Sequence, residues 1–230
     1  MADILHHPGY HLWPMKISKK RLFVWFCATF SLLLLSYYVG AVLYARHKTP
    51  QLVKNWLAKK VITLQVDELS KRQLDILLQV QDPSFFTHSG VTFTAKGTGW
   101  TTITQSVVKW LYFKPFKPGI RKIKQTLIAR FALHPLSTKK EQLTLFINII
   151  WFRPGVHGFR PAARFYFDKD VNELTEDQFI ALVAMLNAPR NYDIKDRPHQ
   201  NRARVARIKR MLSGNYKLKS LFDTEYNMKV

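Results

Sequence analysis

Four short segments carry polar and basic side chains at spacings that suit the binding of an anionic substrate. The first segment, QDPSFFTHSG, starts at Gln81 and Asp82 and ends at His88 and Gly90. Proton transfer at such a turn needs an acid or a base, and a neutral amide is a very poor base. The position of Gln81 therefore indicates a site that binds its ligand without an obvious group to take up a proton.

The second and third segments combine hydroxyl, amide and basic groups. The second segment, GWTTITQSVVK, contains Thr102, Thr104, Gln105 and Lys109. It opens a predicted helix, where free backbone N–H groups attract anions. In the third segment Arg121 and Lys122 precede Gln125 by four and three residues, so the three side chains share one helix face. The fourth segment places Asn148 in an apolar run that is followed by Gly158 and AARFYF.

The elements that position these segments are predicted to be mainly α-helical. Apolar residues recur at helical spacing over residues 67–80, 101–113 and 120–133. Capping boxes at Thr138/Glu141 and Thr175/Gln178 start two more helices, QLTLFINIIWF and FIALVAMLNAP, of which the first should be buried. Residues 199–212 predict a very basic helix. Only residues 61–66 fit a short strand.

A long apolar stretch precedes this domain. Residues 22–45 contain no charge, and ~20 mostly apolar residues suffice to cross a bilayer. A cleaved signal peptide is the alternative, but its apolar part is shorter and ends in a small-x-small site. Leu43, Tyr44 and Ala45 do not fit such a site. We predict a cytoplasmic tail (1–21), a transmembrane anchor (22–45), a membrane-proximal linker (46–66) and the main domain (67–230).

The chain is strongly basic, with 36 Lys and Arg against 15 Asp and Glu and a net charge of +21. Such a charge favours an anionic partner, which can be nucleic acid, anionic lipid or a phosphorylated substrate. Beside an anchor, the anionic membrane surface is the better interpretation, and we expect no nucleic acid partner. The only cysteine is Cys27, so an intrachain disulfide is excluded. Basic residues flank the anchor on both sides, so charge alone leaves the orientation open.

Taken in order, the four segments resemble the peptidoglycan glycosyltransferases, glycosyltransferase family 51. The resemblance covers roughly residues 60–212 and is nearest to the monofunctional biosynthetic transglycosylases, which have one anchor. The residues that match the family's motifs are Asp82, Phe85, His88, Gly90, Gly99, Thr102, Ile103, Thr104, Gln105, Lys109, Arg121, Lys122, Ala129, Leu143, Asn148, Gly158, Ala162, Ala163, Tyr166 and Phe167.

The resemblance implies a lysozyme-like helical domain on the periplasmic side of the bacterial inner membrane. Its substrate would be lipid II, a polyprenyl-linked glycan precursor, and Mg²⁺ or Mn²⁺ often assists in this family. The residues themselves indicate neither a cofactor nor a set of metal ligands. Cell-wall synthesis proteins are further possible partners. The resemblance assigns substrate binding to Phe85, Thr102, Thr104, Gln105, Lys109, Arg121, Lys122 and Asn148.

The departures from the family pattern fall on the residues that would do chemistry. Gln81 replaces the glutamate that acts as general base in the first motif, and Gln125 replaces the glutamate of the third motif. Loss of a general base typically costs ~10²–10⁴ in rate. Further departures are Trp100, Ser106, Trp110, Leu133 and Thr144, and the segment between the first two motifs is shorter than usual.

Three hypotheses follow from these residues. The first is a non-catalytic relative that binds lipid-linked precursor, nascent glycan or a wall-synthesis partner. The second is an active, divergent glycosyltransferase that acts on lipid II or another polyprenyl-pyrophosphate sugar and uses Asp82 or a metal-bound water in place of the missing base. Asp82 is a weak substitute, because misplacing a base by even ~1 Å is costly. The third is an anchored interaction protein whose pocket has no role.

Overall fold

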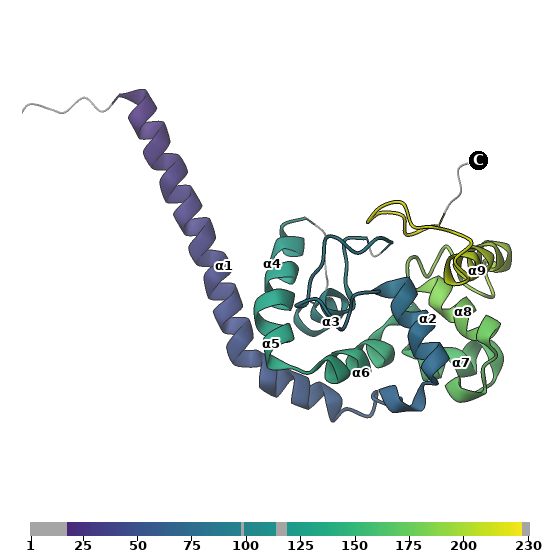
Figure 1. Ribbon diagram of the computed structural model, residues 1–230. Coiled ribbons are helices and arrows are strands. Elements are labelled where there is room, and N and C mark those ends of the chain that lie inside the picture. The colour runs from purple at the N-terminus through teal and green to yellow at the C-terminus, as the bar shows by residue number, and fades with distance from the viewer. Residues whose placement is uncertain (1–17, 98, 114–118, 227–230) are drawn as a thin grey trace, which may run out of the picture. The chain divides into compact units, whose positions relative to one another are not determined.

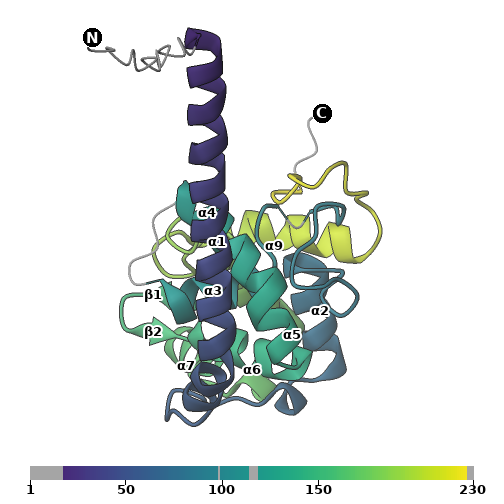
Figure 2. The same cartoon turned by 90° about the vertical axis from the view of Figure 1, so that its left-hand side faces the viewer.

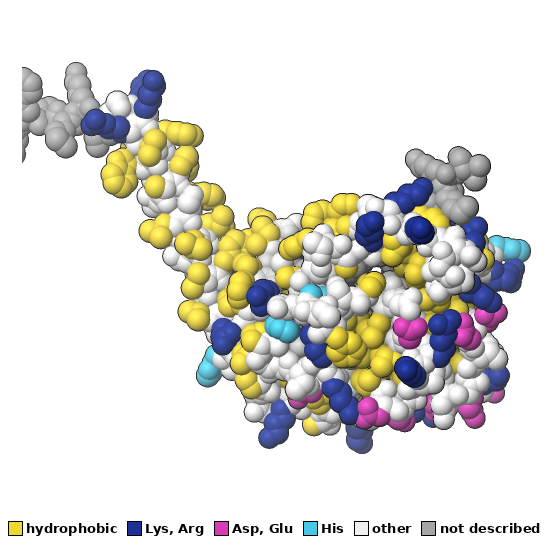
Figure 3. Space-filling view, in the orientation of Figure 1, with side chains coloured by type: hydrophobic (Ala, Val, Ile, Leu, Met, Phe, Trp, Pro, Cys, Tyr) yellow, Lys and Arg dark blue, Asp and Glu magenta, His cyan; other side chains and the backbone are white. Residues whose placement is uncertain are grey.

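The computed structural model describes residues 18–97, 99–113 and 119–226. Its first element is the helix α1 (Lys19–Leu57), which contains the predicted anchor and is long and apolar enough to cross a membrane. Apolar side chains cover the first part of this helix (Figure 3). The chain divides into two compact units after Val39, within α1.

The second part of α1 belongs to the core of the second unit. Ala45, Thr49 and Val53 are buried, and they lie at helical spacing on one face. Thr49 Oγ1 and the Tyr112 hydroxyl form a hydrogen bond of 2.5 Å. Residues 46–57, predicted to belong to a linker, therefore continue the helix and pack against the domain.

The second unit is mainly helical, as predicted, with one small hairpin. Figures 1 and 2 show α6 at the end of this unit opposite to the C-terminal segment. Its further elements, with turns of 3₁₀ or π type marked η, are η1 (Val66–Glu68), α2 (Lys71–Gln81), α3 (Ile103–Tyr112), α4 (Ile120–Ile128), η2 (Ala129–Leu133), α5 (His134–Leu136), α6 (Lys139–Ile149), β1 (Trp151–Arg153), β2 (Val156–His157), α7 (Phe159–Phe167), η3 (Val171–Glu173), α8 (Glu176–Met185) and α9 (Pro198–Leu212).

Helix α6 is buried, as the sequence predicts. Thr138 caps it and accepts a hydrogen bond from the backbone N–H of Glu141. Every residue from 142 to 149 is buried, and the helix packs against α3, α7 and η1. The prediction that this helix includes Trp151 and Phe152 is wrong. The chain turns there into β1, which pairs with β2 across Pro154 and Gly155, and this hairpin is too short to show a sequence alternation.

Other predicted boundaries differ in informative ways. Helix α2 begins at Lys71 instead of residue 67, because Ser70 caps it by accepting from the Gln73 N–H. The predicted strand over residues 61–66 does not form, because the N–H groups of Thr63 and Leu64 donate to a side chain instead. The predicted helix at 120–133 forms, but its second half is the π-helical turn η2. The helix predicted to end at Pro189 already ends at Met185.

Two glycines allow close approaches that position the site. Gly90 has a φ of +88°, and a Cβ there would lie 2.6 Å from the Ala129 carbonyl oxygen. Gly158 has a φ of +82°, and its Cβ would lie 2.6 Å from the Asn148 carbonyl oxygen. Only glycine fits either position without displacing backbone. The loop after α2 is thereby held against η2, and the hairpin against α6.

Candidate functional site

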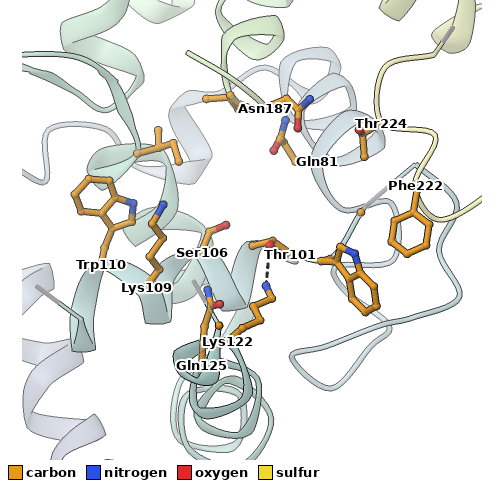
Figure 4. A pocket seen from close by; sticks show the side chains of 15 residues that line it. Gln81, Thr101, Ser106, Lys109, Trp110, Lys122, Gln125, Asn187, Phe222 and Thr224 are labelled. Atoms are coloured by element: carbon orange, nitrogen blue, oxygen red, sulfur yellow. Dashed lines mark hydrogen bonds between the residues drawn. The ribbon is translucent and has the colours of Figure 1, made fainter. Parts of the chain in front are cut away.

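A pocket of about 820 Å³ opens between the ends of α2, α3, α4 and the C-terminal segment. Figure 4 shows Gln81, Asn187 and Thr224 on one side of it, Lys122 and Gln125 on another, and Phe222 at the edge. The described residues that line it are Gln81, Gly99, Trp100, Thr101, Ser106, Lys109, Trp110, Gly119, Lys122, Gln125, Ile150, Leu186, Asn187, Phe222 and Thr224.

Two lysines give one side of the pocket a positive charge. Lys109 comes from the last turn of α3 and Lys122 from the first turn of α4. Lys122 Nζ donates to Thr101 Oγ1 at 2.8 Å. Burial, and then the charge of Lys109, lower the pKa of Lys122 to about 8. Two ammonium groups that disfavour each other in a partly buried pocket are well suited to a phosphate or pyrophosphate, which would neutralise both.

Gln125 lies at the base of this positive side. It is 1% exposed, and its Nε2 donates to the Gln105 carbonyl oxygen at 2.6 Å. Its Oε1 is buried and has no hydrogen-bond partner among the described residues. The Gln105 carbonyl oxygen is an acceptor and needs a donor. An ionised carboxylate at position 125 has no donor and could not make this contact. The Nε2 group of the amide is therefore what makes this contact possible.

Gln81 occupies the opposite side of the pocket. It is the last residue of α2, and its side chain is half-buried beside the lining residues Asn187 and Thr224 (Figure 4). This wall offers amide and hydroxyl groups, which donate and accept hydrogen bonds without charge. Such groups are suited to the hydroxyl and acetamido groups of a sugar.

No acid or histidine is among the described lining residues. Asp82, the predicted substitute base, is fully buried and does not line the pocket. Its Oδ2 accepts from the Ile103 N–H at 3.0 Å and lies 2.9 Å from His88 Nε2. Asp82 thus joins the loop after α2 to the first turn of α3, and the geometry argues against its use as a base.

Most of the other residues predicted to bind substrate hold the scaffold instead. Thr102 caps α3 and donates to the Gly90 carbonyl oxygen, and Gln105 closes the capping box. Thr104 donates to Gln142 within the core. Phe85 is buried and does not line the pocket.

Asn148 also has a structural position. Its Oδ1 accepts from the N–H groups of Thr63 and Leu64, at 2.9 and 3.0 Å. Its Nδ2 donates to the carbonyl oxygens of Leu64 and Thr144, both at 2.7 Å. The side chain therefore fixes the segment before η1 to α6, and it has no hydrogen-bonding atom left for a ligand.

The structure brings together Gln81, Lys109, Lys122 and Gln125, and it leaves Arg121 exposed and outside the lining. Sequence reasoning missed three polar or aromatic residues of the wall, namely Asn187, Phe222 and Thr224. Nothing in their local sequence marks them, because they reach the pocket only through long-range packing. Trp100 carried a signal, since it departs from the family pattern.

The pocket does not suit the divalent metal that the resemblance implies. Mg²⁺ and Mn²⁺ prefer carboxylate and other oxygen ligands. The described part of the chain has no group of three or more His, Cys, Asp or Glu side chains that could hold a metal ion. Lys109 and Lys122 would repel a cation in this pocket. The residues that line this pocket are therefore not suited to hold a divalent metal ion.

Comparison with known proteins identifies a family for this arrangement. The family model described as "Transglycosylase" matches residues 49–213. A "Biosynthetic peptidoglycan transglycosylase" of Shewanella amazonensis is 30% identical over 141 residues, which is 56% of this chain and 57% of that protein. A "Penicillin-binding protein 1F" of Bacillus subtilis is 28% identical over 163 residues, which is 65% of this chain and 23% of that protein.

A "Penicillin-binding protein 1A" of Escherichia coli is 27% identical over 189 residues, covering 75% of this chain and 22% of that protein. The chain thus spans less than two thirds of the length of each of these relatives. The matched region holds the four motif segments and all of the helices from α2 to α8. This chain therefore belongs to the transglycosylases, the peptidoglycan glycosyltransferases of family 51.

Proposed function

We propose that this protein is a membrane-anchored member of the family that binds a lipid-linked glycan precursor or nascent glycan with little or no turnover. One observation carries the proposal. The described lining of the pocket holds two lysines and two glutamines but no carboxylate and no histidine. Such a pocket can bind a pyrophosphate group, but neither glutamine position holds a carboxylate that could accept the proton of a sugar hydroxyl.

Glycosyl transfer requires a base, so the absence of a carboxylate from the described lining matters for turnover. A sugar hydroxyl attacks well only when a base takes its proton, and a positioned base contributes ~10²–10⁴ in rate. Gln81 and Gln125 keep the shape of a glutamate and its hydrogen bonding, but they remove its charge. Without the two acids, Lys109 and Lys122 attract an anionic group more strongly, so binding is strengthened while turnover is lost.

The proposed site of action is the periplasmic side of a bacterial inner membrane, with α1 as the single anchor. The length and apolar character of α1 support an anchor. Residues 46–230 carry 32 Lys and Arg against 14 Asp and Glu, so this part of the chain would be attracted to anionic headgroups. A lipid-linked substrate is presented at the same surface.

The test is binding and polymerisation of lipid II by the full-length protein in vesicles, with Mg²⁺ present. The variants are Gln81→Glu, Gln81→Glu with Gln125→Glu, and Lys109→Ala with Lys122→Ala. Lys71→Ala, which removes an exposed lysine outside the pocket, is the matched control. We expect binding without polymerisation by the natural protein, loss of binding in the double lysine variant, and no change in the control.

Three results would contradict the proposal. Polymerisation by the natural protein would show that a base exists outside the glutamine positions. Absence of lipid II binding, or binding that is unchanged in the double lysine variant, would show that the pocket is not the binding site. Glycan strands made only by a glutamate variant would support a pocket that is intact but lacks its acids.

A further inference from the structure

The pocket is completed by a segment outside the region that defines the family. The family model ends at residue 213, whereas Phe222 and Thr224 line the pocket. In Figures 1 and 2 this C-terminal segment, drawn in yellow, runs from α9 toward the loop between α2 and α3. Residues 217–226 therefore contribute a wall that lies outside the match to the family model.

Backbone hydrogen bonds join this segment to the loop that carries Trp100. The N–H of Gly97 donates to the Ser220 carbonyl oxygen at 2.9 Å, and the N–H of Gly99 donates to the Leu221 carbonyl oxygen at 2.8 Å. The rings of Trp100 and Phe222 then lie with their centroids 5.0 Å apart. The two aromatic residues are therefore placed as a pair by the backbone and not by chance contact.

Glu225 fixes the far end of the segment. Its carboxylate accepts from Arg204 Nη1 at 2.8 Å and from Asn187 Nδ2 at 2.6 Å. Arg204 is 1% exposed, and its Nη2 also donates to the Thr224 carbonyl oxygen. A buried arginine that is satisfied by this segment holds it strongly, because leaving the arginine unpaired would be costly. The same contacts bind the segment to Asn187, which faces the pocket.

Tyr226 secures the segment to the helix that presents Gln81. Its side chain is buried, and its hydroxyl donates to the Val80 carbonyl oxygen at 3.2 Å. Burial raises the pKa of Tyr226 to about 12, so the hydroxyl remains a donor at any working pH. The segment is thus joined to Asn187 through Glu225, and to α2, the helix that ends at Gln81, through Tyr226.

Both rings of the aromatic pair are exposed. Trp100 is 61% exposed and Phe222 is 54% exposed, although both line the pocket. Aromatic ring faces carry negative charge density and attract the weakly positive C–H groups of another molecule. One face of a pyranose ring presents such C–H groups, and its edge presents hydroxyls. Amide and hydroxyl groups at Gln81, Asn187 and Thr224 line the same pocket and can meet that edge.

We propose that residues 217–226 are part of the binding site, and that Trp100 and Phe222 form a platform on which a sugar ring of the ligand stacks. The inference rests on the proposed function and adds to it the residues that select the glycan part of the ligand. In this arrangement the lysine side recognises an anionic group, and the aromatic pair recognises a carbohydrate ring. Glu225 is a positioning residue that acts through Phe222 and Thr224.

Two soluble probes separate these parts of the site. Inorganic pyrophosphate tests the lysine side, and chitotetraose, a β-1,4-linked N-acetylglucosamine oligomer without lipid or phosphate, tests the platform. Calorimetric titration of the full-length protein in detergent measures both. The variants are Trp100→Ala, Phe222→Ala and Trp100→Phe. Phe93→Ala is the matched control, because Phe93 lies in the same loop, is 58% exposed and does not line the pocket.

We expect Trp100→Ala and Phe222→Ala to weaken chitotetraose binding roughly threefold to tenfold, the value of one aromatic contact. Pyrophosphate binding should stay unchanged in both variants, Trp100→Phe should retain most of the sugar affinity, and Phe93→Ala should behave as the natural protein. For Glu225, replacement by Gln should retain more sugar affinity than replacement by Ala, since Gln still accepts from Asn187.

The outcomes distinguish this inference from the proposed function. Natural protein that binds pyrophosphate but not chitotetraose would overturn the platform and leave the lysine site in place. Sugar binding that is equal in all variants, or a parallel loss of both probes, would overturn it as well. Natural protein that binds neither probe nor lipid II would contradict the proposed function itself.

Discussion

Replacing Gln125 by Glu should destabilise the protein at neutral pH, although the family pattern has a glutamate there. The Gln125 side chain is 1% exposed, and its amide donates to the Gln105 carbonyl oxygen at 2.6 Å. An ionised carboxylate has no donor, so the variant would place two oxygen acceptors against each other in a buried position. The perturbation changes one atom and almost no volume, so packing contributes little to the result.

The magnitude follows from the contact that is lost. A hydrogen bond contributes ~0.5–1.5 kcal/mol, and a buried acceptor left without a donor costs ~1–3 kcal/mol. Lys109 and Lys122 line the same pocket and would stabilise the new charge, which offsets part of this cost. We therefore expect the free energy of unfolding to fall by about 1–3 kcal/mol at pH 8.

The pH dependence gives the sharper test. Burial without a donor raises the pKa of the new carboxyl above its value in the unfolded chain, which is ~4.3. Below that value the carboxyl is protonated in both states, and its O–H can donate to the Gln105 carbonyl oxygen as the amide does. As the pH rises from there through the folded-state pKa, the folded state binds more protons than the unfolded state, and the stability falls.

The assay is urea unfolding of the full-length natural protein and variant in detergent, at pH 4.5 and pH 8. The natural protein shares every other titrating group with the variant, so only the difference between the two is used. Gln81→Glu is the control, because it makes the same change at a half-exposed position and should cost little. A Gln125→Glu variant that is as stable as the natural protein at pH 8 would refute the reasoning.

Three further predictions follow from the site. Pyrophosphate affinity of the natural protein should fall as the pH rises above about 8, where Lys122 loses its proton, and Lys122→Arg should remove that fall; calorimetric titration between pH 7 and 9.5 decides this. Asp82→Ala should lower the free energy of unfolding by ~2–4 kcal/mol, since the Ile103 N–H and His88 lose their partner. It should leave pyrophosphate affinity unchanged, and a variant with normal stability but no binding would place Asp82 in the site. Asn148→Ala should cost ~2–4 kcal/mol in urea unfolding, because several buried backbone groups lose their partner, and a loss under ~1 kcal/mol would contradict the structural role.

The helices were predictable where their ends carry their own signals. Thr138 and Thr175 each accept from a backbone N–H three residues later, as the capping-box spacing predicts. The hairpin at residues 151–157 was not predictable, because strands of two and three residues are too short for a periodic pattern. The extended segment at 61–66 has strand composition but finds its hydrogen bonds on Asn148.

The candidate site was only partly predictable, for a different physical reason. A motif marks residues that are needed, but it does not separate those that face the ligand from those that hold the scaffold. Asn148 and Asp82 have the polar side chains of a binding site, yet every contact described for them is internal. Phe222 and Thr224 enter the pocket through contacts with residues more than 100 positions earlier in the chain, which local sequence cannot indicate.

The positions at which the chain departs from its family are not distributed at random in the structure. Five of the seven named departures line the pocket, namely Gln81, Trp100, Ser106, Trp110 and Gln125, whereas Leu133 and Thr144 are buried outside it. Asp82, Thr102, Gln105 and Asn148 match the family and make the internal hydrogen bonds described above. The two lysines and these four scaffold residues are kept while most of the named departures line the pocket, and this supports the proposal of a pocket that still binds but recognises its ligand in a new way.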